Sequence, residues 1–475
     1  MTIENKNIKI ALEGPIIKSI FTLAIPILLA NLLQSAYQLI DAFWVGRLGD
    51  YAIAAVSVSF PITFFMISLG TGFSIAGSTL IAQYVGAKNR KMVNHVAAQT
   101  LFMMTVVSIV LGTIGYILSP SLLSLMGVSP EVFSNALTFM RVSFVGLAFV
   151  FGFSIFQSIM RGIGQVKMPM YIVFGTVCLN FILDPFFIYG YGIVPTMGVA
   201  GAAMATFFTQ GIAAIIGFVI LLRGNYGIHL KLSDFKPDFI YIKKAFFLGL
   251  PSSIEMSVRS LGMIVMTFLI TSFGTIAIAS FGAGSNISQI VIILGMGLSM
   301  STSILVGQNI GANNIKRAKD IAKISALISF ASLTTVGILV FFTAPLLVSF
   351  FVPNDINVIN GGAIFIRTIA FSFGFIGLQF AIMGVFRASG NMVTTMVISL
   401  VSQWVLQLPL AYFLSKHTPL GVQGLWYAFP ISNVLIALIS VFRFMKGTWQ
   451  KTKLTKEYEM IEKISEEANI EGVMK

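Results

Sequence analysis

Long uninterrupted runs of apolar residues restrict the fold of this chain more than any other feature of its sequence. About twelve runs exceed twenty residues, and a helix of that length crosses about 30 Å of hydrocarbon. Only 10% of the residues are charged and the mean hydropathy is +0.91, whereas soluble chains carry about 25% charged residues. The sequence therefore predicts an all-α polytopic membrane protein with about twelve transmembrane helices. The predicted spans cover residues 17–45, 52–83, 93–118, 133–160, 168–190, 197–222, 240–272, 276–307, 321–349, 360–387, 393–414 and 421–445.

Basic residues are distributed unevenly among the connections between these spans. If both termini are cytoplasmic, the outer connections hold few cations beyond Arg47 and Lys416, as the positive-inside rule requires. The formal net charge of +13 is thus explained by topology, and we do not interpret it as nucleic-acid binding. The predicted cytoplasmic connections carry Lys88, Arg90, Lys91, Arg161, Lys167, Arg223, Lys231, Lys236, Lys243, Lys244, Lys316, Arg317, Lys319 and Arg387.

The second half of the chain repeats the first at an offset of 225 residues. Internal repeats of this kind are common in secondary transporters. An even number of spans in each repeat gives both halves the same orientation, with a cavity between them. The matched residues include Pro26 with Pro251, Gly49 with Gly274, Gln83 with Gln308, Gly86 with Gly311 and, after a small drift, Arg161 with Arg387 and Gly198 with Gly421.

The repeat predicts two homologous six-helix lobes around a central cavity, an architecture that suits alternating access. We assign residues 1–222 to an N-lobe, 223–240 to a cytoplasmic linker and 241–446 to a C-lobe. Residues 447–475 are rich in Lys and Glu and predict a charged, solvated cytoplasmic tail. No segment predicts an oligomer, so we expect a monomer in contact with membrane lipids.

The first predicted span carries a row of polar side chains. Asn31, Gln34, Gln38 and Asp41 follow steps of three and four residues, so they share one face of the helix, and Tyr37 lies beside it. Polar groups are unfavourable in hydrocarbon and must face protein or water. We therefore expect Asn31, Gln34, Tyr37 and Gln38 to line the central cavity.

A second polar pair, Asn180 and Asp184, lies one turn apart in the fifth span. The fifth and first helices both run outward, so Asp41 and Asp184 reach comparable depths and can converge in the N-lobe. Two carboxylates in a confined pocket repel each other, so at least one should bind a proton or attract a cation. The alternative is that both acids are helix-end residues wetted by the interface. Their counterparts in the second half are Met266 and Leu408, which favours a function confined to the first half.

Other polar and soft side chains give weaker signals. Glu255 and Arg259 lie one turn apart in the seventh span, either as an ion pair that faces the cavity or as a structural pair. Thioether side chains suit varied amphipathic shapes, so we add Met256 and Met263 to the cavity lining, together with Gln157 of the fourth span.

No enzyme site is recognisable. The chain has no Gly-rich loop that ends in Lys-Ser or Lys-Thr, so we expect no ATP-driven chemistry. His95, His229 and His417 are scattered and lack metal-ligand spacing. We expect no cofactor and no resident metal.

Three motifs stand out: the segment from Leu33 to Gly46, LQSAYQLIDAFWVG, then Leu179 to Pro185, LNFILDP, and Gly198 to Ala203, GVAGAA. Together they resemble the motifs of the multidrug and toxic compound extrusion (MATE) family, most of all its DinF-like branch. The repeated Gly-Ala pairs at 86–87 and 311–312 extend the resemblance over nearly the whole chain.

The resemblance implies secondary active efflux of organic cations and amphipathic toxic compounds by antiport with protons or sodium. It implies a coupling site at Asp41, Asn180, Asp184 and Thr206, where sodium would be the only metal ion bound. It also implies a bacterial or archaeal cytoplasmic membrane. The alternative function is that of a lipid-linked oligosaccharide flippase or polysaccharide exporter, but anionic cargo would call for several Arg or Lys residues inside the cavity.

Overall fold

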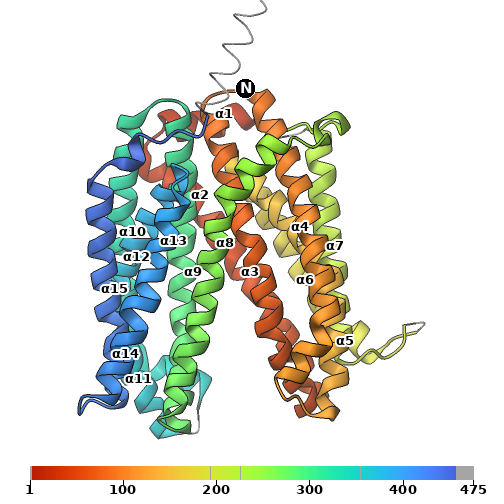
Figure 1. The fold of residues 1–475 in the computed structure, drawn as a ribbon, viewed down its shortest axis with the longest axis vertical. Helices are drawn as coiled ribbons and strands as arrows, with labels where there is room; N and C mark the ends of the chain where they lie inside the picture. Colours follow the sequence, from red (N-terminus) through yellow and green to blue (C-terminus); the bar gives the residue numbers. More distant parts are fainter. Residues whose placement is uncertain (1–2, 193, 225, 354, 456–475) are drawn as a thin grey trace, which may run out of the picture.

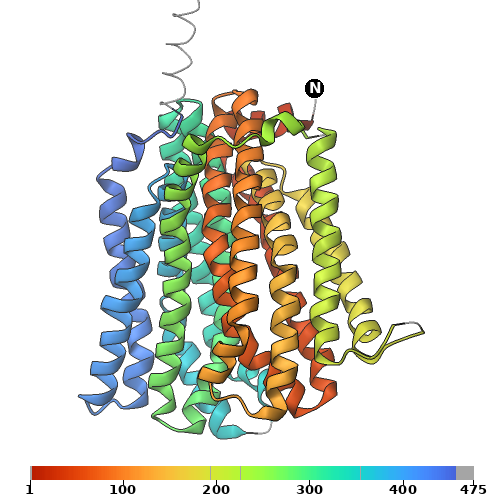
Figure 2. The same cartoon turned by 45° about the vertical axis from the view of Figure 1, so that its right-hand side comes forward.

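The computed structural model describes residues 3–192, 194–224, 226–353 and 355–455, and this part of the chain is almost entirely helical. Figures 1 and 2 show the long helices running between the same two ends of the molecule. Among the described residues, 11 helices are long and apolar enough to cross a membrane, and one bent pair brings the total to 12. The predicted fold class is therefore confirmed.

The first half of the chain contains one short helix and six long ones. They are α1 (Ile3–Glu13), α2 (Ile16–Val45), α3 (Asp50–Gly86), α4 (Arg90–Leu125), α5 (Pro130–Gly162), α6 (Lys167–Tyr189) and α7 (Val199–Arg223), with the short turn η1 (Gly46–Leu48) after α2. Helix α1 precedes the first span and was not predicted. The turn η2 (Leu232–Phe235) lies in the connection to the second half.

The second half contains two interrupted spans. Its helices are α8 (Phe239–Thr271), α9 (Thr275–Gly311), α10 (Ile315–Phe351), α11 (Ile356–Ala370), α12 (Phe373–Ala388), α13 (Met392–Leu400), α14 (Leu408–Lys416) and α15 (Val422–Met445), followed by the turn η4 (Thr448–Gln450). The predicted tenth span is the pair α11 and α12, which bend by 51°. The eleventh contains a π-helical segment, η3 (Val401–Gln407), between α13 and α14.

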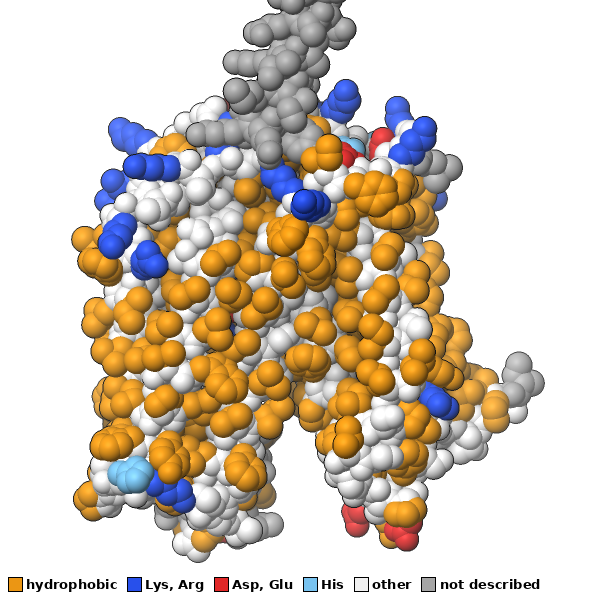
Figure 3. Space-filling model, viewed as in Figure 1, with side chains coloured by type: hydrophobic (Ala, Val, Ile, Leu, Met, Phe, Trp, Pro, Cys, Tyr) orange, Lys and Arg blue, Asp and Glu red, His pale blue; other side chains and the backbone are white. Residues whose placement is uncertain are grey.

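The two halves lean against each other at one end and separate at the other. Figure 1 shows them diverging away from the end that carries α1, and Figure 3 shows the cleft that results. Blue Lys and Arg side chains gather at the closed end, and apolar side chains cover the middle of the molecule (Figure 3). The exposed cations of that end include Lys88, Arg90, Lys167, Lys243 and Lys316.

Two helices cross between the halves near the closed end. The early residues of α2, such as Ile20 and Ile27, belong to the apolar core of the second half, whereas Tyr37 belongs to that of the first. Helix α8 does the reverse, since Tyr241 lies in the first core and Met266 in the second. The division into lobes at residues 1–222 and 241–446 therefore stays a prediction, because α2 and α8 each pack into both apolar cores.

Four repeated residues form a seal between the halves, which we call the closed-end seal: Gln83, Gly86, Gln308 and Gly311. A Cβ on Gly86 would lie 1.9 Å from the Gln308 carbonyl oxygen, and one on Gly311 would lie 1.9 Å from that of Gln83. The Gln83 side chain donates to the Ala388 carbonyl at 2.7 Å, and that of Gln308 donates to Gly162 at 2.9 Å. The repeat thus has a physical basis, because each half supplies the same contact to the other.

The chain after α15 folds back onto the closed end. Trp449 is fully buried, the Leu454 N–H donates to the Gln83 side-chain oxygen, and Lys244 donates to the Leu454 carbonyl. The prediction of a solvated tail is therefore wrong at Trp449, whose indole ring is removed from water, whereas Thr448, Lys451 and Thr452 are exposed. The rest of the predicted tail, residues 456–475, lies outside the described part of the chain.

Candidate ion-coupling site

Helices α2, α6 and α7 pack together and bring the four predicted coupling residues into one cluster. The Thr206 hydroxyl of α7 donates to Asp41 Oδ2 of α2 at 3.3 Å. The Asn180 amide of α6 donates to Asp184 Oδ1 one turn away at 3.2 Å. The Asp41 and Asp184 carboxyl groups face each other closely enough to interact directly. Residues separated by up to 165 positions in the sequence thus meet as the motifs predicted.

The cluster contains buried oxygen atoms that have no hydrogen-bond donor. They are Oδ1 of Asp41, Oδ2 of Asp184 and the side-chain oxygen of Asn180. Asn180 and Asp184 are fully buried, so their side-chain oxygens are out of contact with bulk solvent. A buried acceptor without a partner is unfavourable. A proton on one carboxylate, or a cation held by these oxygens, would satisfy them.

Tyr37 extends the cluster along α2. Its side chain is 4% exposed and lies near Thr176, Thr209 and the two carboxyl groups, and its buried hydroxyl has no hydrogen-bond partner among the described residues. The sequence reasoning missed both threonines. A signal was present, because Thr176, Asn180 and Asp184 follow one another at steps of four residues and so occupy one face of α6.

Small and aromatic residues hold the three helices in register. A Cβ on Gly201 of α7 would lie 2.6 Å from the Phe187 carbonyl, so only glycine allows α7 to approach α6 this closely. At the open end of the cluster, the Trp44 ring packs at 5.8 Å from that of Phe181 and 6.4 Å from that of Tyr189. These rings tie the end of α2 to α6.

The polar row of α2 divides into two faces. Gln34 and Gln38 are exposed and Asn31 is half-buried, whereas Tyr37 and Asp41 turn into the first half of the protein. Exposed amide side chains in a membrane helix face water, so Gln34 and Gln38 fit the predicted cleft lining. The expectation that Tyr37 lines the cavity is wrong, because the helix rotates it toward the carboxylates.

The remaining predicted cavity residues lie apart from the carboxylates. The Gln157 side chain accepts a hydrogen bond from Arg161 at 3.3 Å near the closed end of α5. Met256 is half-buried and Met263 is exposed, both on α8. At the positions that match Asp41 and Asp184, Met266 and Leu408 are buried in the apolar core of the second half.

Glu255 of α8 has a different main partner from the one predicted. Arg387 of α12 donates to its carboxylate at 2.7 Å, whereas Arg259 is 4.0 Å away. Arg387 was predicted to lie in a cytoplasmic connection, but it is 9% exposed and within a helix. Arg161 likewise lies within α5 rather than in a connection. Both spans extend beyond the basic residue that the charge pattern suggested as their end.

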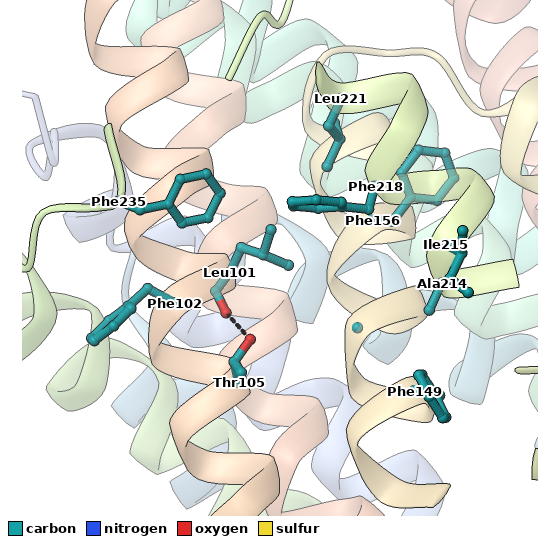
Figure 4. Close-up of a pocket in the computed structure, with 11 residues that line it drawn as sticks. Leu101, Phe102, Thr105, Phe149, Phe156, Ala214, Ile215, Phe218, Leu221 and Phe235 are labelled. Atoms are coloured by element: carbon teal, nitrogen blue, oxygen red, sulfur yellow. Dashed lines mark hydrogen bonds between the residues drawn. The ribbon is translucent and has the colours of Figure 1, made fainter. Parts of the chain in front are cut away.

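A separate hollow of about 440 Å³ lies between α4, α5 and α7. Figure 4 shows it lined by aromatic and aliphatic side chains, with Phe235 of η2 on one side. Its Thr105 hydroxyl is already bonded to the Leu101 carbonyl of the same helix at 2.9 Å. This hollow contains no charged side chain and is not the ion site.

Two repeated helical halves around a cleft, with a buried acid pair in one half, define the class of two-lobed membrane transporters. The chain belongs to the MatE family, whose sequence model matches residues 26–186 and 251–413. The resemblance to the MATE family is thereby confirmed, and the protein is a transporter rather than an enzyme.

Curated relatives and solved structures are similar over nearly the full length. The chain is 29% identical over 449 residues to the "Probable multidrug resistance protein YpnP" of Bacillus subtilis, covering 94% of this chain and 98% of the relative. It is 28% identical over 450 residues to the "Probable multidrug resistance protein NorM" of Thermotoga maritima, covering 93% and 95%. A solved multidrug resistance MATE transporter in an outward-facing conformation is 26% identical, with a TM-score of 0.86 over 95% of this chain and 100% of that one.

Proposed function

We propose that this protein is a multidrug efflux transporter that exchanges organic cations and amphipathic compounds for protons or sodium ions. The observation that carries the proposal is the set of buried carboxylate and amide oxygens without donors at Asp41, Asn180 and Asp184. The names of the full-length relatives support multidrug efflux. The flippase alternative is not favoured, because the buried acid pair does not suit a pyrophosphate cargo.

The charge distribution supports an orientation in which the closed end is cytoplasmic. Lys and Arg side chains gather there (Figure 3), as expected for cytoplasmic loops. The cleft then opens to the outside, and both termini face the cytoplasm of a bacterial or archaeal cell. We infer a monomer, since the two halves of one chain already enclose the cleft.

The coupling step follows from the chemistry of the cluster. In the inward-open state, an ion-free carboxylate pair attracts a cationic substrate into the cavity. After the cleft opens outward, a proton or a sodium ion binds between Asp41 and Asp184 and cancels their repulsion, so α2 and α6 pack more tightly. Pro26 lies inside α2 and leaves one backbone carbonyl without its helical donor, which allows the helix to bend. The substrate is thereby released outward.

The membrane potential supplies part of the driving force when more positive charge enters with the ions than leaves with the substrate, as it does for a neutral or zwitterionic substrate. One elementary charge that moves through 100 mV releases about 2.3 kcal/mol, which sustains a roughly fiftyfold gradient. A proton or sodium gradient adds to this term. Both ions are compatible with carboxylate, amide and hydroxyl ligands, so the ion is assigned by experiment.

The test is dye efflux from proteoliposomes with pH and sodium gradients imposed separately. We expect Asp41→Asn and Asp184→Asn to abolish gradient-driven efflux. Asp50→Asn is the matched control, because Asp50 is exposed at the start of α3 and should pump normally. Normal efflux by both site variants would refute the coupling role of the pair.

A further inference from the structure

The second half contains a charged cluster that ion coupling does not use. Glu255, Arg259, Arg387 and Ser399 meet between α8, α12 and α13. Arg387 and Ser399 both donate to Glu255 Oε1, at 2.7 Å and 3.2 Å. Two guanidinium groups thus share one carboxylate, and the nearer one has the better geometry. Arg259, at 4.0 Å, is the cation in excess.

Arg259 lies where the two halves begin to separate. A Cβ on Gly72 of α3 would lie 2.1 Å from the Ser253 backbone nitrogen, so α3 and α8 touch at this level. Arg259 follows Ser253 by six residues, about 9 Å further along α8 toward the open end. Its side chain is 36% exposed, in contrast to 1% for Glu255. A charged group in the middle of a membrane helix faces water rather than lipid, so this exposed part of Arg259 opens into the cleft.

The surroundings hold the Arg259 guanidinium in place. It lies 5.6 Å from the centre of the Phe380 ring and donates to the Ser399 hydroxyl at 3.4 Å. The adjacent π-helical segment η3 is fixed to α8, because the Trp404 indole donates to the Val258 carbonyl at 3.2 Å. π-Helical segments are often found at functional sites. The Arg259 guanidinium is therefore held in place before a ligand binds, and some of its N–H groups remain to donate to that ligand.

The acids of the second half do not compensate this charge. Besides Glu255, the acidic residues between 241 and 446 are Asp320 and Asp355, and both are exposed near the starts of α10 and α11. The buried carboxylates of the first half lie in the α2, α6 and α7 cluster. The cleft thus has excess positive charge on the side of α8 and acidic groups within the other half.

We propose that Arg259 is a specificity-determining residue that binds the anionic group of zwitterionic amphipathic substrates. This inference rests on the proposed efflux function and names a residue that selects among its substrates. A guanidinium has a planar fork of donors that matches a carboxylate, sulfonate or phosphate in bidentate geometry. A zwitterion that carries both a carboxylate and an amine matches the opposite charges of the two halves.

The test is equilibrium binding of two matched dyes to the purified full-length protein, followed by fluorescence polarisation. Rhodamine 110 carries a free carboxylate, and rhodamine 123 is its cationic methyl ester. We expect Arg259→Gln to weaken the binding of rhodamine 110 by about tenfold or more, as loss of a charge-assisted hydrogen bond does, and to leave rhodamine 123 within about twofold. Arg259→Lys keeps the charge but loses the planar fork of donors, so its affinity for rhodamine 110 should lie between those of the native protein and Arg259→Gln.

Controls separate recognition from structure and from coupling. Arg47→Gln removes the same charge from an exposed position beyond α2 and should change neither dye. An equal loss of both dyes in Arg259→Gln would assign Arg259 a structural role and overturn the proposal, as would unchanged binding of rhodamine 110 or its absence in the native protein. Because binding needs no gradient, failure of ion-coupled efflux leaves this measurement interpretable.

Discussion

Substituting alanine for both glycines of the closed-end seal should open the closed end of the protein. In Gly86→Ala, the new Cβ must move from 1.9 Å to at least 3.0 Å from the Gln308 carbonyl oxygen, and Gly311→Ala imposes the same shift on the opposite side. The obstructing atoms are backbone, so no side chain can rotate out of the way. The two halves must therefore separate locally by about 1.1 Å, if atoms are to keep ordinary contact distances.

This separation removes the hydrogen bonds that cross the seal. A bond of 2.7 Å between Gln83 and Ala388 would lengthen to about 3.8 Å, which is beyond hydrogen-bonding distance. The bond from Gln308 to Gly162 is affected in the same way. Each hydrogen bond contributes about 0.5–1.5 kcal/mol, so the sealed state of the double variant should be destabilised by about 1–3 kcal/mol. The population of sealed protein relative to protein open at this end should then fall about 5- to 150-fold.

The assay measures the distance between two spin labels by pulsed electron paramagnetic resonance. Lys91 and Lys316 are exposed at matching positions in the first turns of α4 and α10, so cysteines there report the separation of the halves. The single native cysteine, Cys178, is exposed and must first be replaced by alanine. We expect a second, longer distance in the double variant.

A control glycine in the same helix tests whether packing is the cause. Gly282 of α9 has open space where a Cβ would lie, so Gly282→Ala should leave the distances unchanged. An unchanged distribution in the double variant would refute the reasoning, and so would the same change in Gly282→Ala.

Two further predictions concern polar contacts inside the membrane. Thr206→Val removes the hydroxyl that donates to Asp41 and should shift the ion concentration for half-maximal efflux about fivefold, the equivalent of about 1 kcal/mol. The shift should be downward for protons, because the carboxylate without its donor binds a proton more tightly, and upward for sodium, because a hydroxyl ligand is lost. Thr138→Val, at an exposed hydroxyl bonded to its own helix, should cause no shift. Glu255→Gln leaves Arg387 as a buried charge without its carboxylate and should destabilise the protein by about 3–5 kcal/mol in thermal unfolding, while Glu255→Gln combined with Arg387→Gln should recover part of the loss. Equal stability of Glu255→Gln and the native protein would contradict the pairing.

The sequence predicted the helices and their repeat because both depend on local patterns. Apolar length alone located the spans, and matched residues such as Gly86 and Gly311 predicted two equivalent halves. Their physical role did not follow, because a glycine that permits a contact between distant helices looks like any other glycine in a span. The exchange of α2 and α8 between the two cores was likewise not predictable, since the apolar residues along each helix do not show which core they join.

The candidate site was predicted in its acids and incompletely in its neighbours. Asp41 and Asp184 stand out because carboxylates are rare in apolar spans, whereas Thr176 and Thr209 resemble the many hydroxyl residues that bond to their own helices. Arg387 was misplaced because a basic residue after an apolar run normally marks a cytoplasmic end. Only the three-dimensional packing shows that Glu255, far away in the sequence, neutralises it.

The central claim, that the carboxylate pair exchanges a coupling ion for substrate, is tested most directly by measuring ion release when substrate binds. The purified protein would first be equilibrated with radioactive sodium in weak buffer, and rhodamine 123 would then be added. A pH indicator would report released protons, and equilibrium dialysis would report released sodium. The native protein should release one of the two ions. The combined variant Asp41→Asn with Asp184→Asn should bind the cationic dye more weakly and, at a dye concentration that saturates it, release neither ion. Undiminished release from that variant, or substrate binding by the native protein without any release, would contradict the account.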